Sequence, residues 1–147
     1  MRSGPDSDIP FSPAGLPAVL LRAVAASGAV QGITIARCAD DLPLVYANSS
    51  FQRMTGYAPD EILGRNCRFL QGPETDRVEV ARLSDGIRRH HDVSVVIRNY
   101  RQDGTPFWNR VSISPIKDPQ TGLVTHFIGT QVDVTDLVER RAAPVRR

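Results

Sequence analysis

The chain has 147 residues, 41% of them hydrophobic, and a formal net charge of +2. This length fits one domain with its own core, and the near-neutral charge does not favour nucleic acid as a partner. Two cysteines are too few for a disulfide scaffold or a four-cysteine metal site. The longest apolar run, residues 16–24, is too short to span a membrane and contains Pro17 and Arg22. We therefore expect a soluble, cytoplasmic protein without membrane contact.

The first half of the chain predicts short elements. Residues 1–12 are rich in Pro, Ser, Gly and Asp, which predicts disorder, and residues 13–28 carry apolar residues at helical spacing. That N-terminal helical extension packs on its own domain or contacts a second copy, and the pattern leaves both open. Residues 32–38 and 44–47 read as strands. Asn48 is a suitable N-cap for a helix over 49–55, and a short helix over 59–63 follows.

The second half predicts a longer helix and a three-stranded meander. A helix begins after Asp76, which with Glu79 resembles a capping pair, and turns Val80, Leu83 and Ile87 inward. Strands follow at 93–101, 106–116 and 123–134, joined by glycine-containing turns. A short C-terminal helix with a basic tail fills 135–147, so the domain proper covers 32–134.

Side-chain amides share one face of the three long strands. Asn99, Asn109 and Gln131 have the parity of the apolar residues Val95, Ile97, Val111, Ile113 and Phe127. Buried amides need hydrogen-bond partners, which are each other or a ligand. A flat heterocycle with neighbouring N–H and C=O groups suits them, because amides both donate and accept.

The opposite face of these strands is also partly apolar. It carries Val96, Trp108, Ile128 and Val132, and requires a cover. The simplest covers are the terminal helices or a second copy of the chain.

One cysteine lies in the run Gly64–Gly72, between Arg65 and Arg68. The thiol of Cys67 is a nucleophile, a metal ligand or a packed core residue, and the run alone does not decide. The two arginines either stabilise a thiolate or hold a ligand's phosphate. The three histidines are scattered, which predicts no metal site. We read His90 and His91 as surface residues, and His126 has the parity of the outer face, opposite Gln131.

At these residues the sequence resembles light-oxygen-voltage (LOV) domains, a flavin-binding branch of the PAS fold. Residues 64–71 match the family signature GRNCRFLQ at every position. The match extends to Asn99-Tyr100, Phe107-Trp108-Asn109 and Phe127–Gln131, and covers roughly 32–136. The resemblance implies an α+β PAS/LOV fold, in which helices cover one face of a five-stranded antiparallel sheet and form a flavin pocket.

The resemblance also implies a cofactor and a set of site residues. Flavin mononucleotide (FMN) is expected, with riboflavin or flavin adenine dinucleotide (FAD) as alternatives, held non-covalently in the dark. Blue light makes the sulfur of Cys67 bond reversibly to the flavin C4a carbon. Asn99 and Asn109 hold the pyrimidine edge, Gln131 contacts O4 and N5, Arg68 holds the phosphate, and Asn66 and Gln71 also line the site. The implied apolar wall consists of Ile33, Ile35, Leu70, Val80, Leu83, Ile87, Val111, Ile113, Phe127 and Gly129.

The chain departs from the family pattern at three positions. Ser84 stands where many members have a second arginine for the phosphate, with Arg77 or Arg82 as candidate substitutes. Ile35 and Leu42 stand where polar residues are common. Fewer phosphate and ring contacts predict looser flavin binding or faster adduct decay.

The expected function is a short blue-light photoreceptor and not an enzyme. It signals through its terminal helices and a homodimer formed by these helices and the outer sheet face, to an unknown downstream protein. Two alternatives remain: a PAS ligand-binding or interaction module without photochemistry, and a flavin or thiol redox protein.

Overall fold

In the computed structural model, residues 31–142 are described. The predictions for 1–12, for 13–28 and for the tail after residue 142 lie outside these residues. Five strands and five helical segments follow one another, and all of them except the short segment Cys67–Leu70 match the predicted order of elements. They are β1 (Gly32–Arg37), β2 (Leu44–Ala47), α2 (Ser49–Thr55), α3 (Pro59–Ile62), η2 (Cys67–Leu70), α4 (Arg77–Arg88), β3 (Val93–Tyr100), β4 (Pro106–Lys117), β5 (Val124–Asp133) and α5 (Thr135–Ala142).

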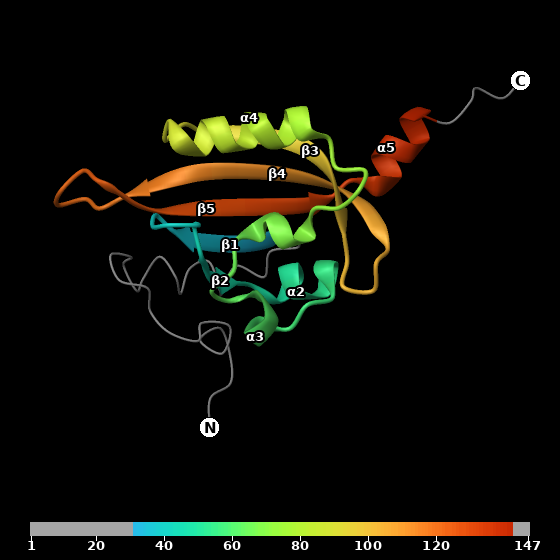
Figure 1. Ribbon diagram of the computed structural model, residues 1–147, viewed down its shortest axis with the longest axis horizontal. Coiled ribbons are helices and arrows are strands. Elements are labelled where there is room, and N and C mark those ends of the chain that lie inside the picture. Colours follow the sequence, from blue (N-terminus) through green and yellow to red (C-terminus); the bar gives the residue numbers. More distant parts are fainter. Residues whose placement is uncertain (1–30, 143–147) are drawn as a thin grey trace, which may run out of the picture.

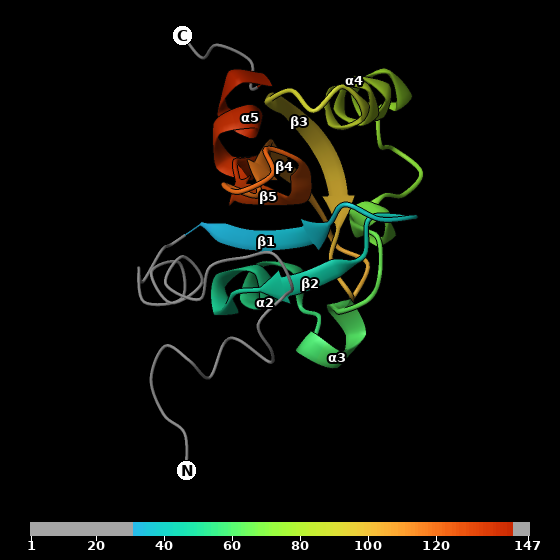
Figure 2. The ribbon, with the colours of Figure 1, turned by 90° about the vertical axis from the view of Figure 1, so that its left-hand side faces the viewer.

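The strands form one antiparallel sheet in the order β2-β1-β5-β4-β3 (Figure 1). The chain therefore crosses from the β1–β2 edge to the β3 edge through α2, α3, η2 and α4, and returns to the middle of the sheet with β5. The sheet curves around the side on which α4 lies, and α5 lies on its other side (Figure 2). This arrangement confirms the predicted α+β class and five-stranded antiparallel sheet.

Asn48 connects α2 to β1. Its Oδ1 accepts hydrogen bonds from the backbone N–H of Phe51 at 3.0 Å and of Ile33 at 2.9 Å. The predicted N-cap is thus confirmed, and the same oxygen also fixes β1 against α2. Gly56 ends α2 in the left-handed region at φ 79°, where a side chain is disfavoured.

Asp76 caps α4, but the predicted capping pair does not form. The side chain of Asp76 accepts from the N–H of Val78 at 2.9 Å. The carboxylate of Glu79 pairs with Arg82 at 2.9 Å. An arginine one turn along the helix attracts the carboxylate more strongly than a neutral backbone N–H does.

None of the helices within residues 31–142 is long and apolar enough to cross a membrane.

Candidate ligand-binding site

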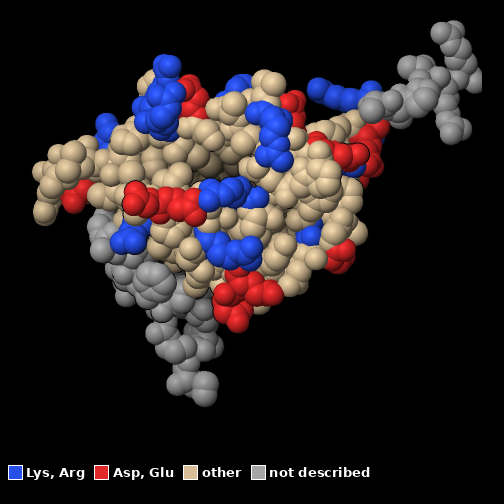
Figure 3. Space-filling view, viewed as in Figure 1, with Lys and Arg blue, Asp and Glu red and all other residues tan. Residues whose placement is uncertain are grey.

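A cavity of about 620 Å³ lies between the inward face of the sheet and the helices α4 and η2. Figure 3 shows basic side chains around the hollow beneath α4. The volume is in the range of sites for cofactor-sized molecules. Most of the predicted site residues line the cavity, namely Asn66, Cys67, Arg68, Gln71, Val80, Leu83, Ile87, Asn99, Asn109, Val111, Ile113, Phe127, Gly129 and Gln131.

The three amides share the cavity wall, as their parity predicted. Asn109 Nδ2 donates to Asn99 Oδ1 at 2.9 Å, and Asn99 Nδ2 donates to the carbonyl of Arg98 at 3.3 Å. On β5, Gln131 Nε2 donates to Thr34 Oγ1 at 3.0 Å. All three side chains are at most 2% exposed. They form two separate groups, one on β3 and β4 and the other between β1 and β5.

Two buried amide oxygens remain without a hydrogen-bond partner. They are Asn109 Oδ1 and Gln131 Oε1. A buried acceptor without a donor costs about 1–3 kcal/mol, so such groups are usually satisfied by a further molecule. Gly129 lies directly against the hydrogen bond between Thr34 and Gln131, because a Cβ at this position would come 2.8 Å from Thr34 Oγ1 and 3.1 Å from Gln131 Nε2. The unsatisfied oxygen of Asn109 and the second N–H of the Gln131 amide fit the polar edge of a planar flavin ring.

Cys67 begins η2 and lines the same cavity. Burial raises the pKa of its thiol to about 12, because the charged thiolate is disfavoured away from water. The thiol is therefore protonated at physiological pH. Within residues 31–142, no cluster of His, Cys, Asp and Glu suits a metal ion.

The arginines on either side of Cys67 have different roles. Arg65 stacks over the ring of Phe69 at 4.4 Å and donates to the carbonyl of Glu61, and it does not line the cavity. Arg68 lines the cavity and forms an ion pair with Asp41. Only Arg68 of these two is placed to meet an anionic group of a ligand.

Further cationic groups line the cavity from α4. Arg77 donates to Gln71 Oε1 at 3.0 Å, and Arg88 pairs with Asp85. Both line the cavity, as does Ser84, whereas Arg82 does not. Of the two candidate substitutes for a phosphate-binding arginine, the structure thus brings Arg77 to the site.

The predicted face of β1 requires a correction. Thr34 pairs with Gly129 and Ala36 with Phe127, and paired residues of an antiparallel sheet lie on the same face. Thr34 and Ala36 therefore line the cavity, while Ile33 and Ile35 face the other side and pack with Val45 and Tyr46. The sequence alone does not show which face of β1 lines the cavity, because residues on both faces of this strand are buried.

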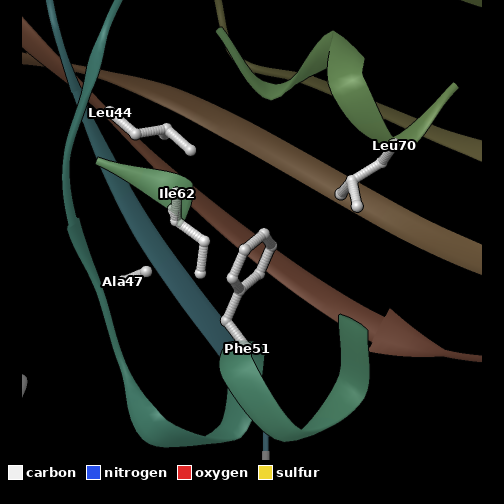
Figure 4. Packing of buried hydrophobic residues seen from close by; sticks show 5 residues of the cluster. All are labelled: Leu44, Ala47, Phe51, Ile62 and Leu70. Carbon is white, nitrogen blue, oxygen red and sulfur yellow. The ribbon is translucent and has the colours of Figure 1, made fainter. Parts of the chain in front are cut away.

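Leu70 also does not line the cavity. It is 1% exposed and packs with Phe51, Ile62, Leu44 and Ala47. Figure 4 shows the side chains of Leu70 and Ile62 around the ring of Phe51. This cluster joins η2 to α2, α3 and β2, and so holds the turn that carries Cys67.

Several cavity residues were not predicted from the sequence. They are Thr34, Ala36, Cys38, Leu44, Arg88, His90 and Ile97, together with Leu42 and Ser84, which had been noted only as departures. His90 is exposed, as expected, yet it lies at the cavity with its ring 5.8 Å from that of Phe127. Ile97 had been placed on the face of the three amides by its parity, but it had not been named as a site residue. Arg88 lies one helical turn after Ser84 on α4, and this spacing could have predicted that Arg88 lines the cavity as well.

Comparison with known proteins agrees with this fold. The family of the PAS domain matches residues 30–136. The chain is 51% identical over 113 residues to the "Bacterioopsin transcriptional activator" of Halobacterium salinarum, which covers 76% of this chain and 16% of that protein. It is 49% identical over 108 residues to "Blue-light-activated histidine kinase 1" of Erythrobacter litoralis, covering 73% of this chain and 30% of the relative. The chain thus spans less than a third of the length of these relatives.

A solved structure shares the fold at the level of the whole domain. It is described as "Flavin Analogue Sheds Light on Light-Oxygen-Voltage Domain Mechanism" and superposes with a TM-score of 0.75 at 40% identity. The match covers 84% of this chain and 90% of that chain. The chain therefore belongs to the PAS family, and within it to the light-oxygen-voltage domains.

Proposed function

We propose that the chain senses blue light with FMN bound in the cavity and with Cys67 as the reactive residue. One observation carries this proposal: a protonated thiol lines the same cavity as three buried amides, two of which have an unsatisfied oxygen. Apolar side chains from α4, β3, β4 and β5 complete the wall. The blue-light-activated relative and the structure described with a flavin analogue support this ligand.

The protonated state of Cys67 suits a reversible addition. A bound flavin would supply, when excited, an electrophilic C4a carbon and a basic N5 atom. Cys67 would provide its sulfur for C4a and its thiol proton for N5, so that the S–H bond would break as the S–C bond formed. The reverse transfer in the dark would restore the thiol, and no external oxidant or reductant would be needed.

The other cavity residues bind and orient the cofactor. Asn99, Asn109 and Gln131 hold the polar edge of the ring, and Val80, Leu83 and Ile87 cover it from α4. Arg68 holds the phosphate, with Arg77 on the same wall. Since Ser84 offers only a hydroxyl, riboflavin is a competitor for the site, and FAD is a second.

The absorption spectrum of the purified chain tests this proposal. We expect a flavin band that bleaches under blue light and returns in the dark, whereas Cys67→Ala keeps its band throughout. Cys38→Ser is the matched control and should cycle like the unmodified chain, although Cys38 lines the same cavity. A chain that takes up no flavin would indicate a different PAS ligand. A bound flavin that never bleaches would indicate redox chemistry.

We also infer that the signal leaves through α5 and the outer face of the sheet, in a homodimer. Gln131 precedes α5 by four residues, and Asp133 between them accepts from the N–H of Thr135 at 3.0 Å and pairs with Arg101 at 2.7 Å. Val96 on the outer face and Leu137 on α5 are 37% and 59% exposed. These apolar surfaces suit contact with a second copy, which would pass the signal on to a downstream protein.

A further inference from the structure

The hydrogen bond between Gln131 and Thr34 joins two strands at the cavity wall. Gln131 Nε2 donates to Thr34 Oγ1 at 3.0 Å, and the two residues are 2% and 4% exposed. They lie in β5 and β1, and the bond lies directly against Gly129, where a Cβ would come 2.8 Å from Thr34 Oγ1 and 3.1 Å from Gln131 Nε2. A side chain at position 129 would therefore displace this hydrogen bond.

The hydrogen bond shows how the Gln131 amide is turned. Oxygen and nitrogen of a side-chain amide exchange places when the group turns by half a revolution, at almost no change in shape. Here the nitrogen lies on the side of Gly129 and Thr34. The oxygen lies on the side of Gly32, where a Cβ would stand 3.3 Å from it. Of the residues described here, only Thr34 forms a hydrogen bond with this amide.

We propose that Thr34 is a positioning residue that orients the Gln131 amide so that its N–H₂ group, and not its oxygen, faces the bound ligand. The nitrogen has two hydrogens, and the bond to Thr34 uses one of them. The second remains for an acceptor in the cavity, such as a ring carbonyl. The inference rests on the proposed function for the identity of that ligand, but the hydrogen bond itself belongs to the chain alone.

Substitution of Thr34 separates hydrogen bonding from packing. Thr34→Val has nearly the same shape but cannot bond, whereas Thr34→Ser keeps the hydroxyl and loses a methyl group. Thr130→Val makes the same exchange one residue from Gln131 on the outer face and is the control. If Thr34 only packs, Thr34→Ser should have the larger effect. If Thr34 positions Gln131 through the hydrogen bond, Thr34→Val should have the larger effect.

The first readout uses the chain without flavin. The side-chain amide protons of Gln131 are identified by nuclear magnetic resonance, from the signals that vanish in Gln131→Leu. In Thr34→Val we expect the chemical shift of one of these protons to change to the value of an amide proton without a hydrogen bond. Thr34→Ser and Thr130→Val should leave it in place. Unchanged Gln131 signals in Thr34→Val would overturn the inference, whether or not the chain binds flavin.

The second readout uses the chain loaded with FMN in the dark. In Thr34→Val, part of the population presents the Gln131 oxygen, so the infrared band of the flavin carbonyl that Gln131 contacts should move to higher frequency or split. The dark-recovery rate should change by about fivefold, the factor that one ordinary hydrogen bond represents. In the Gln131→Leu background, Thr34→Val should have no further effect. An equal effect in both backgrounds would show that Thr34 does not act through Gln131.

Discussion

The environment of Cys67 shows how individual residues set the chemistry of this site. Two arginines next to a thiol would ordinarily favour the thiolate. Here Arg65 stacks on Phe69 and Arg68 pairs with Asp41, so neither charge is directed at the sulfur. Burial therefore dominates and raises the pKa of Cys67 to about 12.

His126 leads to a prediction about pH at the scale of the residue. It is 1% exposed, and burial lowers the pKa of its imidazole, with a smaller effect from the positive charge of Arg37. The unfolded chain binds a proton here near pH 6.5, while the folded chain does so only at lower pH. The free energy of unfolding should thus fall as the pH drops below about 6.5, by at most about 1.4 kcal/mol per pH unit for this proton.

Chemical denaturation between pH 7 and pH 5 measures this effect. His126→Gln should reduce the slope of unfolding free energy against pH. His91→Gln makes the same exchange at an exposed position and serves as the control. If both variants have the same slope, protonation of His126 is not linked to folding.

The elements differ in how well the sequence predicts them. The inward faces of β3, β4 and β5 are predicted by alternation, because their outer faces carry more polar and exposed residues such as Ser94 and Arg110. β1 has no such contrast, because Gly32 to Ile35 are all buried. Its cavity face is determined by the pairing with β5, which is not encoded within β1. For this reason the roles of Ile33 and Ile35 were assigned to the wrong face, and Thr34 was missed.

Gly86 gives a prediction at the scale of the element. It is buried inside α4, and a Cβ there would lie 2.6 Å from the Cβ of Val93 on β3. Alanine favours helices over glycine by about 1 kcal/mol, but overpacking of a tight contact costs about 1–3 kcal/mol. The Val93 Cβ is attached to the strand and cannot turn away. We therefore expect Gly86→Ala to lower the free energy of unfolding by about 1 kcal/mol.

Denaturant unfolding of a double-mutant cycle checks this contact. In the Val93→Gly background, the cost of Gly86→Ala should disappear, and the helix preference of alanine should become visible as a gain. A loss of the same size in both backgrounds would mean that Gly86 is needed for another reason.

At the scale of the whole molecule, the chain is a curved sheet with a cavity on one side and partly exposed apolar residues on the other. The signature around Cys67 and the three amides was sufficient to predict the fold and most residues of the cavity wall. Among the basic groups it was sufficient only for Arg68, because arginine side chains are long and their positions depend on partners such as Asp41, Gln71 and Asp85. Arg88, which comes to the cavity from one turn beyond Ser84, was missed for this reason.

The outer face gives a prediction about assembly. We expect light scattering to give the mass of two chains of 16.2 kDa. Val96→Asp should shift this mass towards one chain, because it places a charge in an apolar contact. Val78→Asp changes a valine that is 68% exposed on α4, on the cavity side of the sheet, and should leave the mass unchanged. A mass of one chain in the dark and under light would refute the dimer.

The central claim is that the Cys67 thiol itself forms the light-induced bond. The infrared difference spectrum of the FMN-loaded Cys38→Ser variant, in which Cys67 is the last thiol of the chain, tests it most directly. We predict that the S–H stretching band disappears under blue light and returns at the same rate as the flavin absorption. A flavin band that bleaches while the S–H band persists would contradict the account, and would mean that light reduces the flavin without using Cys67.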